Sequence, residues 1–412
     1  MNGNRRGLSL FTSSLLALLM LLALSTFVVG PRIADEKLLA ASAVWTLFLT
    51  VILFLMLRTG RVSRYRSTFF VIYAVSFVIV FVGDLIAERG SMALSRETIA
   101  ARQVPLCPVA IPQLILPALI KRLLIFPTQI VAGHYGGFWA VLALWFVGVL
   151  ALGRGWCSWG CFYGGIDEGF AQLLRRPLLS TRRLPERWRL LPTAVLVLVV
   201  VCSFLDLGPT YCRWLCPLKL VTEYPAVDSP VAYLQTVVFV TLGMGLLIVL
   251  PVLTSKRIHC GLFCPLGALN AKLGPVNPYR VRIDPALCSG CGRCQDACPT
   301  FSITGASLET KRVDGSCTRC GRCLDGCPRG AISYRLVGVP VAGVPAGGAA
   351  APPPPAPLWR RWLAWPGRVG RELVEARALF LFTAVLFGGV LSGGFVSQAL
   401  CRVAGWLGEL RP

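Results

Sequence analysis

Two sets of four cysteines near the C-terminal end of the chain have a spacing that holds iron–sulfur clusters. Both read C-x2-C-x2-C-x3-C-P, the run with which bacterial ferredoxins bind [4Fe–4S] clusters, and the second set begins 29 residues after the first. The two sets are Cys288, Cys291, Cys294, Cys298 and Cys317, Cys320, Cys323, Cys327.

The fourth cysteine of each run is expected to bind the cluster of the other run, because three thiolates of a short loop grip one cluster and the loop cannot bend back to supply a fourth. Zinc is the alternative, since C-x2-C pairs also build tetrahedral zinc sites. Zinc gives no reason for the duplicated third cysteine or for the Cys-Pro ending. We therefore predict one cluster on Cys288, Cys291, Cys294 and Cys327 and a second on Cys317, Cys320, Cys323 and Cys298.

Three further pairs of cysteines are spaced C-x3-C: Cys157/Cys161, Cys212/Cys216 and Cys260/Cys264. Residues four apart share one face of a helix, so each pair aims two sulfurs at one spot. Two thiols cannot complete a cluster, and each pair therefore needs a partner.

The order of the apolar segments indicates which pairs can meet. Cys157/Cys161 follows the fourth apolar segment and Cys260/Cys264 follows the sixth, so we expect both pairs at the same membrane face, where they are candidates for a third cluster. A second candidate group on the opposite face combines Cys212/Cys216 with Cys107 and Cys202, and Cys401 competes for a place in it. Two other interpretations stay open for this second group: a disulfide bond, or thiols that are only small buried side chains.

The remaining candidate ligands argue against other cofactors. A bis-histidine haem needs two histidines at one level, and the two in this chain, His134 and His259, lie at opposite ends of the membrane region. His259 adjoins Cys260 and is either a neighbour of a cluster or an interfacial polar residue, and we favour the latter. No dinucleotide or P-loop fingerprint is present, so we predict neither flavin nor haem.

The elements that must position these cysteines are membrane helices. The chain is 55% hydrophobic and only 15% charged, and apolar runs of the roughly 20 residues that a span needs recur along it. The first run follows two arginines and could be a signal peptide, but its length and the nearby second run favour a retained anchor. The predicted spans are 9–30, 38–57, 68–87, 135–152, 191–207, 231–253 and 378–400.

The net charge of +22 is distributed as membrane topology requires and does not indicate nucleic-acid binding. Arginines fill the loops after the second and fourth spans, which places those loops, the N-terminus and the ferredoxin segment in the cytoplasm and the C-terminus in the periplasm of a bacterial inner membrane. The apolar stretch Ile111–Val131 contains three prolines and a Lys-Arg pair, and we interpret it as re-entrant or interfacial.

The predicted fold is a multi-span α-helical membrane protein with an inserted α+β ferredoxin domain of the bacterial 2[4Fe–4S] type. A stretch rich in proline, alanine and glycine follows that domain as a stiff linker, and a segment with three tryptophans and several arginines precedes the last span. The predicted regions are 1–134 (three spans and the re-entrant segment), 135–280 (membrane core with the C-x3-C motifs), 281–335 (ferredoxin domain), 336–357 (linker) and 358–412 (interfacial segment and last span).

The motifs HCGLFCPLGAL and WCSWGCFYGG, followed by the ferredoxin pair, resemble those of the membrane-bound polyferredoxins typified by NapH and the membrane core of NosR. The resemblance covers roughly residues 135–335 and implies a redox-chain component that serves a periplasmic reductase or its maturation. The chain departs from the family pattern in three ways: Phe162 replaces the proline after the second cysteine of one motif, no flavin-bearing domain is present, and a seventh span follows a proline-rich linker.

The sequence therefore predicts a membrane-bound electron-transfer protein that relays single electrons between the ferredoxin domain, the quinone pool and a periplasmic partner such as a reductase or c-type cytochrome. The alternative is a redox-sensing or assembly factor for a periplasmic reductase. No nucleophile–base arrangement indicates an enzyme with its own substrate. Four arginines near the ferredoxin cysteines could raise the cluster potentials or dock an acidic partner, but for any single one we expect a solvated surface residue: Arg293, Arg319, Arg322 and Arg329.

Overall fold

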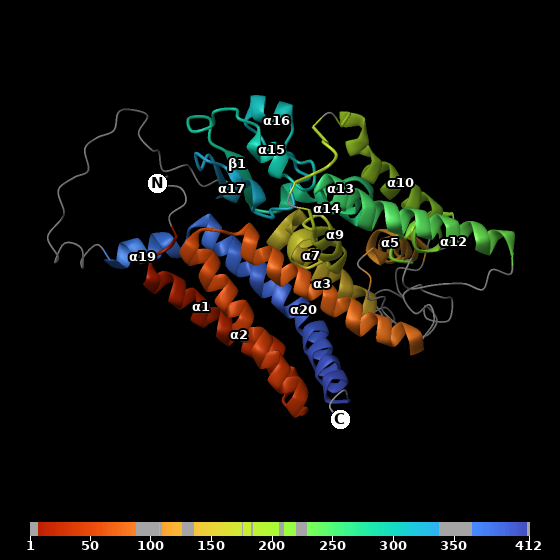
Figure 1. Ribbon diagram of the computed structural model, residues 1–412, viewed down its shortest axis with the longest axis horizontal. Coiled ribbons are helices and arrows are strands. Elements are labelled where there is room, and N and C mark those ends of the chain that lie inside the picture. Colours follow the sequence, from red (N-terminus) through yellow and green to blue (C-terminus); the bar gives the residue numbers. More distant parts are fainter. Residues whose placement is uncertain are drawn as a thin grey trace.

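Seven apolar helical segments long enough to cross a membrane form most of the computed structural model (Figure 1). Each overlaps one predicted span, which confirms the multi-span helical architecture. The structure describes residues 7–87, 107, 109–125, 136–174, 176–182, 184–205, 210–219, 229–337 and 365–409. The seven segments are Leu10–Arg32, Glu36–Thr59, Ser63–Phe81, Leu142–Phe170, Glu186–Phe204, Pro230–Thr254 and Ala376–Gly408.

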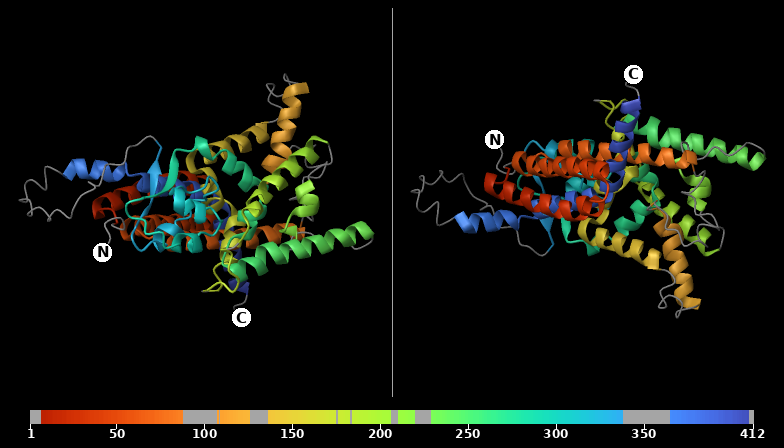
Figure 2. Two further views of the ribbon diagram at one scale, coloured as in Figure 1. Left: turned by 90° about the horizontal axis from the view of Figure 1, so that it is seen from above. Right: turned by 90° about the horizontal axis from the view of Figure 1, so that it is seen from below.

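Four long helices pack along one another and form one part of the membrane region (Figures 1 and 2). The C-terminal helix lies between the others and is joined to its neighbour by two buried polar contacts. Trp45 Nε1 donates to Ser392 Oγ at 3.1 Å, and the Ser42 and Ser397 hydroxyls lie 2.9 Å apart. Such contacts satisfy polar groups where no water is present. The four helices are α1 (Leu10–Leu24), α2 (Glu36–Thr59), α3 (Ser63–Ala87) and α20 (Ala376–Glu409).

The other part of the membrane region carries the three C-x3-C pairs, and Figure 2 shows its helix α12 projecting away from the four-helix bundle. After α7 the chain turns back into the protein as α9, which lies antiparallel on α3. The Phe162 ring stacks 3.7 Å from that of Phe77, while Glu168 bonds Arg66 near the start of α3. The helices are α7 (Gly136–Leu152), α8 (Trp156–Trp159), α9 (Phe162–Phe170), α10 (Leu191–Phe204), α12 (Pro230–Leu242), α13 (Leu250–Thr254) and α14 (Pro265–Lys272).

A short broken helix, η4 (Ile111–Ile115) followed by α5 (Leu116–Ile125), packs against α10. It occupies the described part of the segment that we interpret as re-entrant or interfacial, and its apolar stretch is shorter than a full span. Gln113 is fully buried, so the start of this segment belongs to the protein interior. Residues 126–131 of the segment lie outside the described residues.

The inserted domain is a two-stranded antiparallel sheet with three short helices, and it caps the membrane region (Figure 1). Strand β1 (Tyr279–Ile283) pairs with β2 (Ile332–Leu336), with Val281 opposite Tyr334. The two strands bracket both cysteine runs, which are carried by α15 (Arg293–Ala297) and α17 (Arg322–Gly326), with α16 (Gly305–Thr310) between them.

Several helix ends lie beside the inserted domain. Asp325 accepts hydrogen bonds from the backbone of Val62 and Ser63 at the start of α3, and the Phe380 ring near the start of α20 stacks on Tyr334. Helix α20 then runs to the opposite end of the molecule, where the C-terminus lies (Figure 1).

Helix α19 (Trp365–Leu373) precedes α20 and contacts α1. Its Glu372 accepts hydrogen bonds from Ser9 and Thr12. The predicted linker 336–357 and the first part of the predicted interfacial segment lie, beyond residue 337, outside the described residues.

Candidate iron–sulfur centres

The eight ferredoxin cysteines form two groups, each containing the fourth cysteine of the other run. The Cys294 thiol interacts electrostatically with those of Cys327 and Cys288. The Cys323 thiol does so with Cys317, Cys320 and Cys298, and also with Cys294 of the first group. This is the crossed arrangement that the spacing predicts, with the two groups next to each other.

Equivalent backbone features surround the two groups. Gly292 and Gly321 precede α15 and α17 with φ of 74° and 81°, a left-handed conformation that glycine adopts without strain. The backbone N–H groups of Ser302 and Ala331 each donate to the sulfur of the cysteine four residues earlier, Cys298 and Cys327, at 3.3 Å. Hydrogen bonds to sulfur raise the reduction potential of a cluster.

The donor set fits iron–sulfur clusters. Each group offers four thiols, and burial raises the pKa of the Cys294 thiol to about 11 and that of the Cys317 thiol to about 12, so these thiols ionise readily only when a cation binds them. Among the described residues, no three His, Cys, Asp or Glu side chains converge tightly enough to hold a single metal ion.

Two of the C-x3-C pairs converge beneath the ferredoxin domain. The Cys260 and Cys264 thiols both interact electrostatically with that of Cys157, and Cys264 also interacts with Cys161. All four are at least nine-tenths buried. The structure thus brings together the four thiols that are the candidates for a third cluster.

The spacing of these pairs suggested regular helices, but the structure places the cysteines differently. Cys157 lies in the short helix α8, and Cys161 is the extended residue before α9. Cys260 lies in the π-helical turn η9 (His259–Phe263), and Cys264 is the extended residue before α14. The second sulfur of each pair therefore lies at a helix N-terminus, where free N–H groups stabilise a thiolate.

Two buried arginines connect this four-thiol group to the ferredoxin domain. Arg154 donates to the carbonyl oxygens of Ser316 at 2.6 Å and Cys260 at 2.9 Å. Arg257 donates to the Cys157 carbonyl and lies 3.4 Å from Cys260 Sγ, while its backbone N–H donates to the Pro299 carbonyl at 2.8 Å. The two arginines therefore touch both the membrane pairs and the loops beside Cys298 and Cys317.

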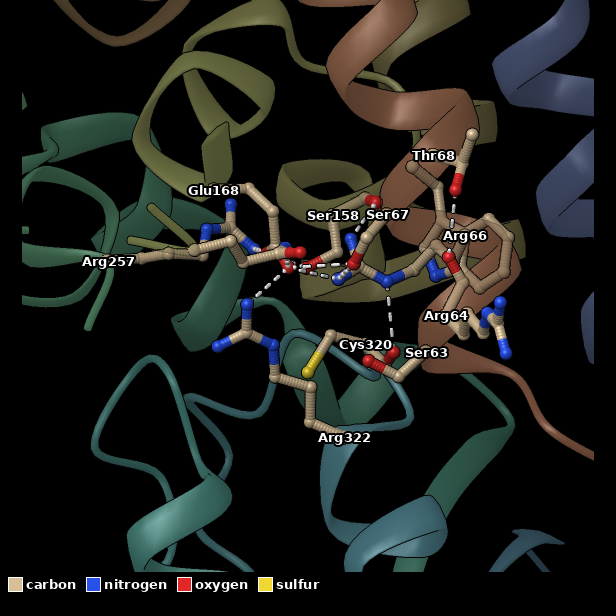
Figure 3. Close-up of polar contacts among 12 residues, drawn as sticks. Ser63, Arg64, Arg66, Ser67, Thr68, Ser158, Glu168, Arg257, Cys320 and Arg322 are labelled. Carbon is tan, nitrogen blue, oxygen red and sulfur yellow. Dashed lines mark hydrogen bonds and ion pairs between the residues drawn. The ribbon is translucent and has the colours of Figure 1, made fainter. Parts of the chain in front are cut away.

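A fully buried carboxylate offsets this positive charge (Figure 3). Glu168 on α9 accepts from Arg66 at 2.7 Å and from Arg322 at 2.9 Å, and its second oxygen lies 3.7 Å from Arg257. Arg66 also donates to the Cys320 carbonyl at 2.9 Å. One carboxylate thus binds an arginine from the bundle, one from the membrane core and one from the ferredoxin domain.

Three residues lie elsewhere than predicted, and one of them is Arg322, whose side chain is only 17% exposed and pairs with Glu168 as described above. Arg319 is not a solvated surface residue: it is 5% exposed and donates to the Leu152 and Tyr279 carbonyls, and burial lowers its pKa to about 10. His259 is not interfacial: it is fully buried and stacks on Tyr163 at 5.1 Å. The other histidine, His134, lies outside the described residues.

The contacts of Arg154 and Arg257 with both the cysteine pairs and the ferredoxin domain were not predicted, although the sequence contains a signal for them. Each arginine stands three residues before the first cysteine of its pair, so both motifs read R-x2-C-x3-C. The repeated spacing of an arginine before a cysteine pair is the sequence signal that could have identified them.

The third pair lies closer to the others than predicted. Tyr163, two residues after Cys161, has its hydroxyl 3.1 Å from Cys216 Sγ, so Cys212/Cys216 lies in the interior near the start of α9 and not apart at the opposite face. The Cys107 thiol interacts electrostatically with those of Cys212 and Cys216.

The other two candidates for this group are Cys202 on α10 and Cys401 on α20, and both are half-buried. None of the seventeen cysteines, all of which are described residues, forms a disulfide bond in the structure.

Family models of iron–sulfur domains match both the ferredoxin domain and the segments that carry the C-x3-C pairs. Residues 280–328 match the family described as 4Fe-4S dicluster domain, and residues 134–179, 188–228 and 236–276 match three copies of the 4Fe-4S binding domain. Each of the three copies contains one C-x3-C pair. No solved structure matches the chain.

Three curated proteins are similar to the chain. The methylamine utilization ferredoxin-type protein MauN of Methylobacillus flagellatus is 29% identical, over 31% of this chain and 61% of MauN. YccM of Escherichia coli, provisionally named an electron transport protein, is 25% identical over 40% of this chain and 46% of YccM. The ferredoxin-type protein NapH of Haemophilus influenzae is 26% identical over 34% of this chain and 63% of NapH. The chain thus spans less than two thirds of the length of each of these relatives.

Proposed function

We propose that this NapH-like polyferredoxin, a multi-span helical membrane protein with 4Fe-4S binding domains, is an electron carrier that relays single electrons between a soluble redox protein and the quinone pool or a periplasmic redox partner. The observation that carries the proposal is the unbroken succession of thiol groups from the surface of the ferredoxin domain into the membrane core. Iron–sulfur clusters supply reversible one-electron oxidation and reduction when bound.

The residues that would hold the clusters differ in their access to solvent. In the ferredoxin domain Cys291 is exposed, which makes this end of the succession the place where a soluble partner can approach. Cys157, Cys161, Cys260 and Cys264 are 3–6% exposed, so the protein keeps water away from the membrane group. We propose two [4Fe–4S] clusters on the ferredoxin cysteines, with the crossed ligand sets described above, and a third on these four.

The buried arginines fix the relative position of the two regions. Arg154 binds carbonyl groups of both, and Arg66 joins the Cys320 carbonyl to that of Ser158 at 3.1 Å. Electron transfer between sites requires that their separation be short, and each of these guanidinium groups holds carbonyl groups of both regions together. We infer that the ferredoxin domain works docked in this position.

The proposed location is the bacterial inner membrane, with the N-terminus and ferredoxin domain in the cytoplasm and the C-terminus in the periplasm. The arginine-rich loops that follow α2 and α9 support it. Reporter fusions at Pro340 and Pro412 should give opposite signals, with the cytoplasmic one at Pro340. Equal signals would contradict the orientation.

The test of the relay uses the full-length protein in sealed liposomes, with a reduced one-electron donor protein on the ferredoxin side and an electron acceptor on the other. Each electron that leaves the donor should appear in the acceptor, in steady turnover. The replacement Cys260→Ser should abolish this flux, whereas Cys401→Ser, the matched control outside the thiol groups, should leave it unchanged. Clusters that are reduced without any flux would support the redox-sensing or assembly role instead.

A further inference from the structure

We propose that Cys107, Cys212 and Cys216 bind an iron–sulfur cluster of their own, separate from the one assigned to the four-thiol group, and that its fourth iron has an oxygen ligand in place of a thiolate. The proposal extends the proposed electron carrier by one more site inside the membrane core. The bound cofactor is a [4Fe–4S] cluster, because three thiolates and one oxygen supply the four protein ligands that it needs.

Three segments bring the thiols together. Cys107 precedes η4, while Cys212 lies in the π-helical turn η7 (Tyr211–Leu215) and Cys216 ends it in extended conformation. Cys107 and Cys216 are 6% and 7% exposed. The Lys219 backbone N–H donates to the Cys216 carbonyl oxygen at 3.2 Å, which closes a turn directly after the second thiol of this pair.

The thiols of the membrane core cannot be divided equally between two clusters. Seven cysteines lie in the two adjoining groups, and four of them, Cys157/Cys161 and Cys260/Cys264, already form one complete ligand set. The Cys107 thiol also interacts with that of Cys161, but more weakly than with Cys212 and Cys216. The second set therefore has three thiols and needs a ligand of another kind.

Buried oxygen atoms are available at that position. Gln113 is fully buried, and its Nε2 donates to Cys212 Sγ at 2.8 Å. Its Oε1 has no hydrogen-bond partner among the described residues, and the same is true of the hydroxyl of Tyr211, which is also fully buried. An unsatisfied buried polar atom costs about 1–3 kcal/mol, so such atoms are rare unless something binds them.

The two oxygens are well placed for this role. Gln113 is held against the group by its own amide nitrogen, and Tyr211 interacts electrostatically with Cys216, Cys107 and Cys212 on one side and with Cys264 on the other. Its ring also lies 6.2 Å from that of Phe263, the residue before Cys264, so Tyr211 is a neighbour of both thiol groups. We assign the oxygen ligand to one of these two side chains.

The first experiment counts iron in full-length protein purified without oxygen. Each [4Fe–4S] cluster carries four irons, so the double variant Cys212→Ser/Cys216→Ser should lose about four irons per chain. The pair Cys157→Ser/Cys161→Ser should lose about four as well, and the combined variant about eight, because independent sites are additive. The control Cys202→Ser should lose none.

Two outcomes would overturn the proposal. One is an unchanged iron content in the Cys212→Ser/Cys216→Ser variant. The other is a combined variant that loses only about four irons, which would mean that all seven thiols serve one cluster. Retained ferredoxin-domain absorbance in each variant separates cluster loss from misfolding. If the iron count is as predicted but the liposomes show no electron flux, the site stands and the relay function fails.

The second experiment addresses the oxygen ligand spectroscopically. Gln113→Leu and Tyr211→Phe are tested separately, and one of them should change the paramagnetic resonance spectrum of a single cluster. Gln113→Cys should give an all-thiolate site with the same iron content and a lower reduction potential. Spectra unchanged in both Gln113→Leu and Tyr211→Phe would refute oxygen ligation.

Discussion

The C-x3-C pairs of the four-thiol and three-thiol groups belong to copies of one domain, yet the electrostatic surroundings of the two groups differ. The first and third C-x3-C pairs each follow an arginine that is buried beside them, Arg154 or Arg257. At the equivalent position before Cys212 the sequence has Pro209. The three-thiol group is surrounded by the neutral polar side chains of Gln113 and Tyr163 and by Lys219, a cation that is only half-buried.

For the clusters proposed at both groups, the C-x3-C motif supplies ligands, and the neighbouring residues set the reduction potential. Adding an electron makes a cluster more negative, so a nearby buried cation stabilises the reduced form and raises its potential. We expect a higher potential at the four-thiol group than at the three-thiol group. Three substitutions test the role of these charges, and they follow in order of decreasing expected effect.

The largest effect is expected from Glu168→Gln. The substitution conserves shape but removes the carboxylate that neutralises Arg66, Arg257 and Arg322, and leaving buried charges unpaired costs roughly 3–5 kcal/mol. Denaturant unfolding in detergent, followed by loss of cluster absorbance, should show a large decrease in the free energy of unfolding.

The matched control for this variant is Glu309→Gln on the exposed side of α16, where we expect a change within about 0.5 kcal/mol. Equal stability of the two variants would show that the buried network does not hold the ferredoxin domain in place.

A smaller and more selective effect is expected from Arg257→Gln. The loss of a cation 3.4 Å from Cys260 Sγ should lower the reduction potential of the four-thiol centre by on the order of 50 mV. The centre at Cys107, Cys212 and Cys216 should keep its potential. Arg257→Lys, which retains the charge, should shift the potential less in a redox titration monitored by paramagnetic resonance, and a shift of both centres would contradict the proposed difference between them.

The smallest effect is expected at the rim of the interface between the ferredoxin domain and the membrane core. Arg189 lies 3.1 Å from Asp314, whose side chain is 44% exposed. Burial raises the pKa of Asp314, but hydrogen bonds from Ser316 and the Arg189 charge outweigh it and bring this pKa below its usual range. The resulting stabilisation is therefore present above pH 4 and is lost as the pH falls through the lowered pKa.

Asp314→Asn should accordingly destabilise the protein by less than about 1 kcal/mol at pH 7, and this difference should shrink in strong acid and in high salt. The measurement is the difference in unfolding free energy between wild type and variant across pH. A difference that persists unchanged at low pH would show that the carboxylate charge is not its cause.

Much of the fold followed from composition and periodicity alone. Each of the seven apolar segments overlaps a predicted span, because the length of a membrane helix is fixed by bilayer thickness and every span must be apolar. The crossed grouping of the ferredoxin cysteines was likewise predictable, since a short loop restricts which thiols can reach one cluster.

The sequence did not reveal that the side chains of some loop and helix-end arginines are buried inside the protein. Arg66 and Arg154 fit the positive-inside pattern by position, yet both are buried and bind carbonyl groups of distant segments. Periodicity describes which residues face lipid or water. It contains no information on which carboxylate or carbonyl from another segment can neutralise a charge.

Residue type and spacing by themselves determined the membrane spans, the ferredoxin domain and the three cysteine pairs, because these depend on local chain geometry and on transfer from water to lipid. Only the tertiary structure decided which pairs meet. Helix α9 folds back along α3 and carries Tyr163 to Cys216, and that contact joins segments 53 residues apart in the chain. Such proximity arises from packing of whole helices against one another, and no local pattern specifies it.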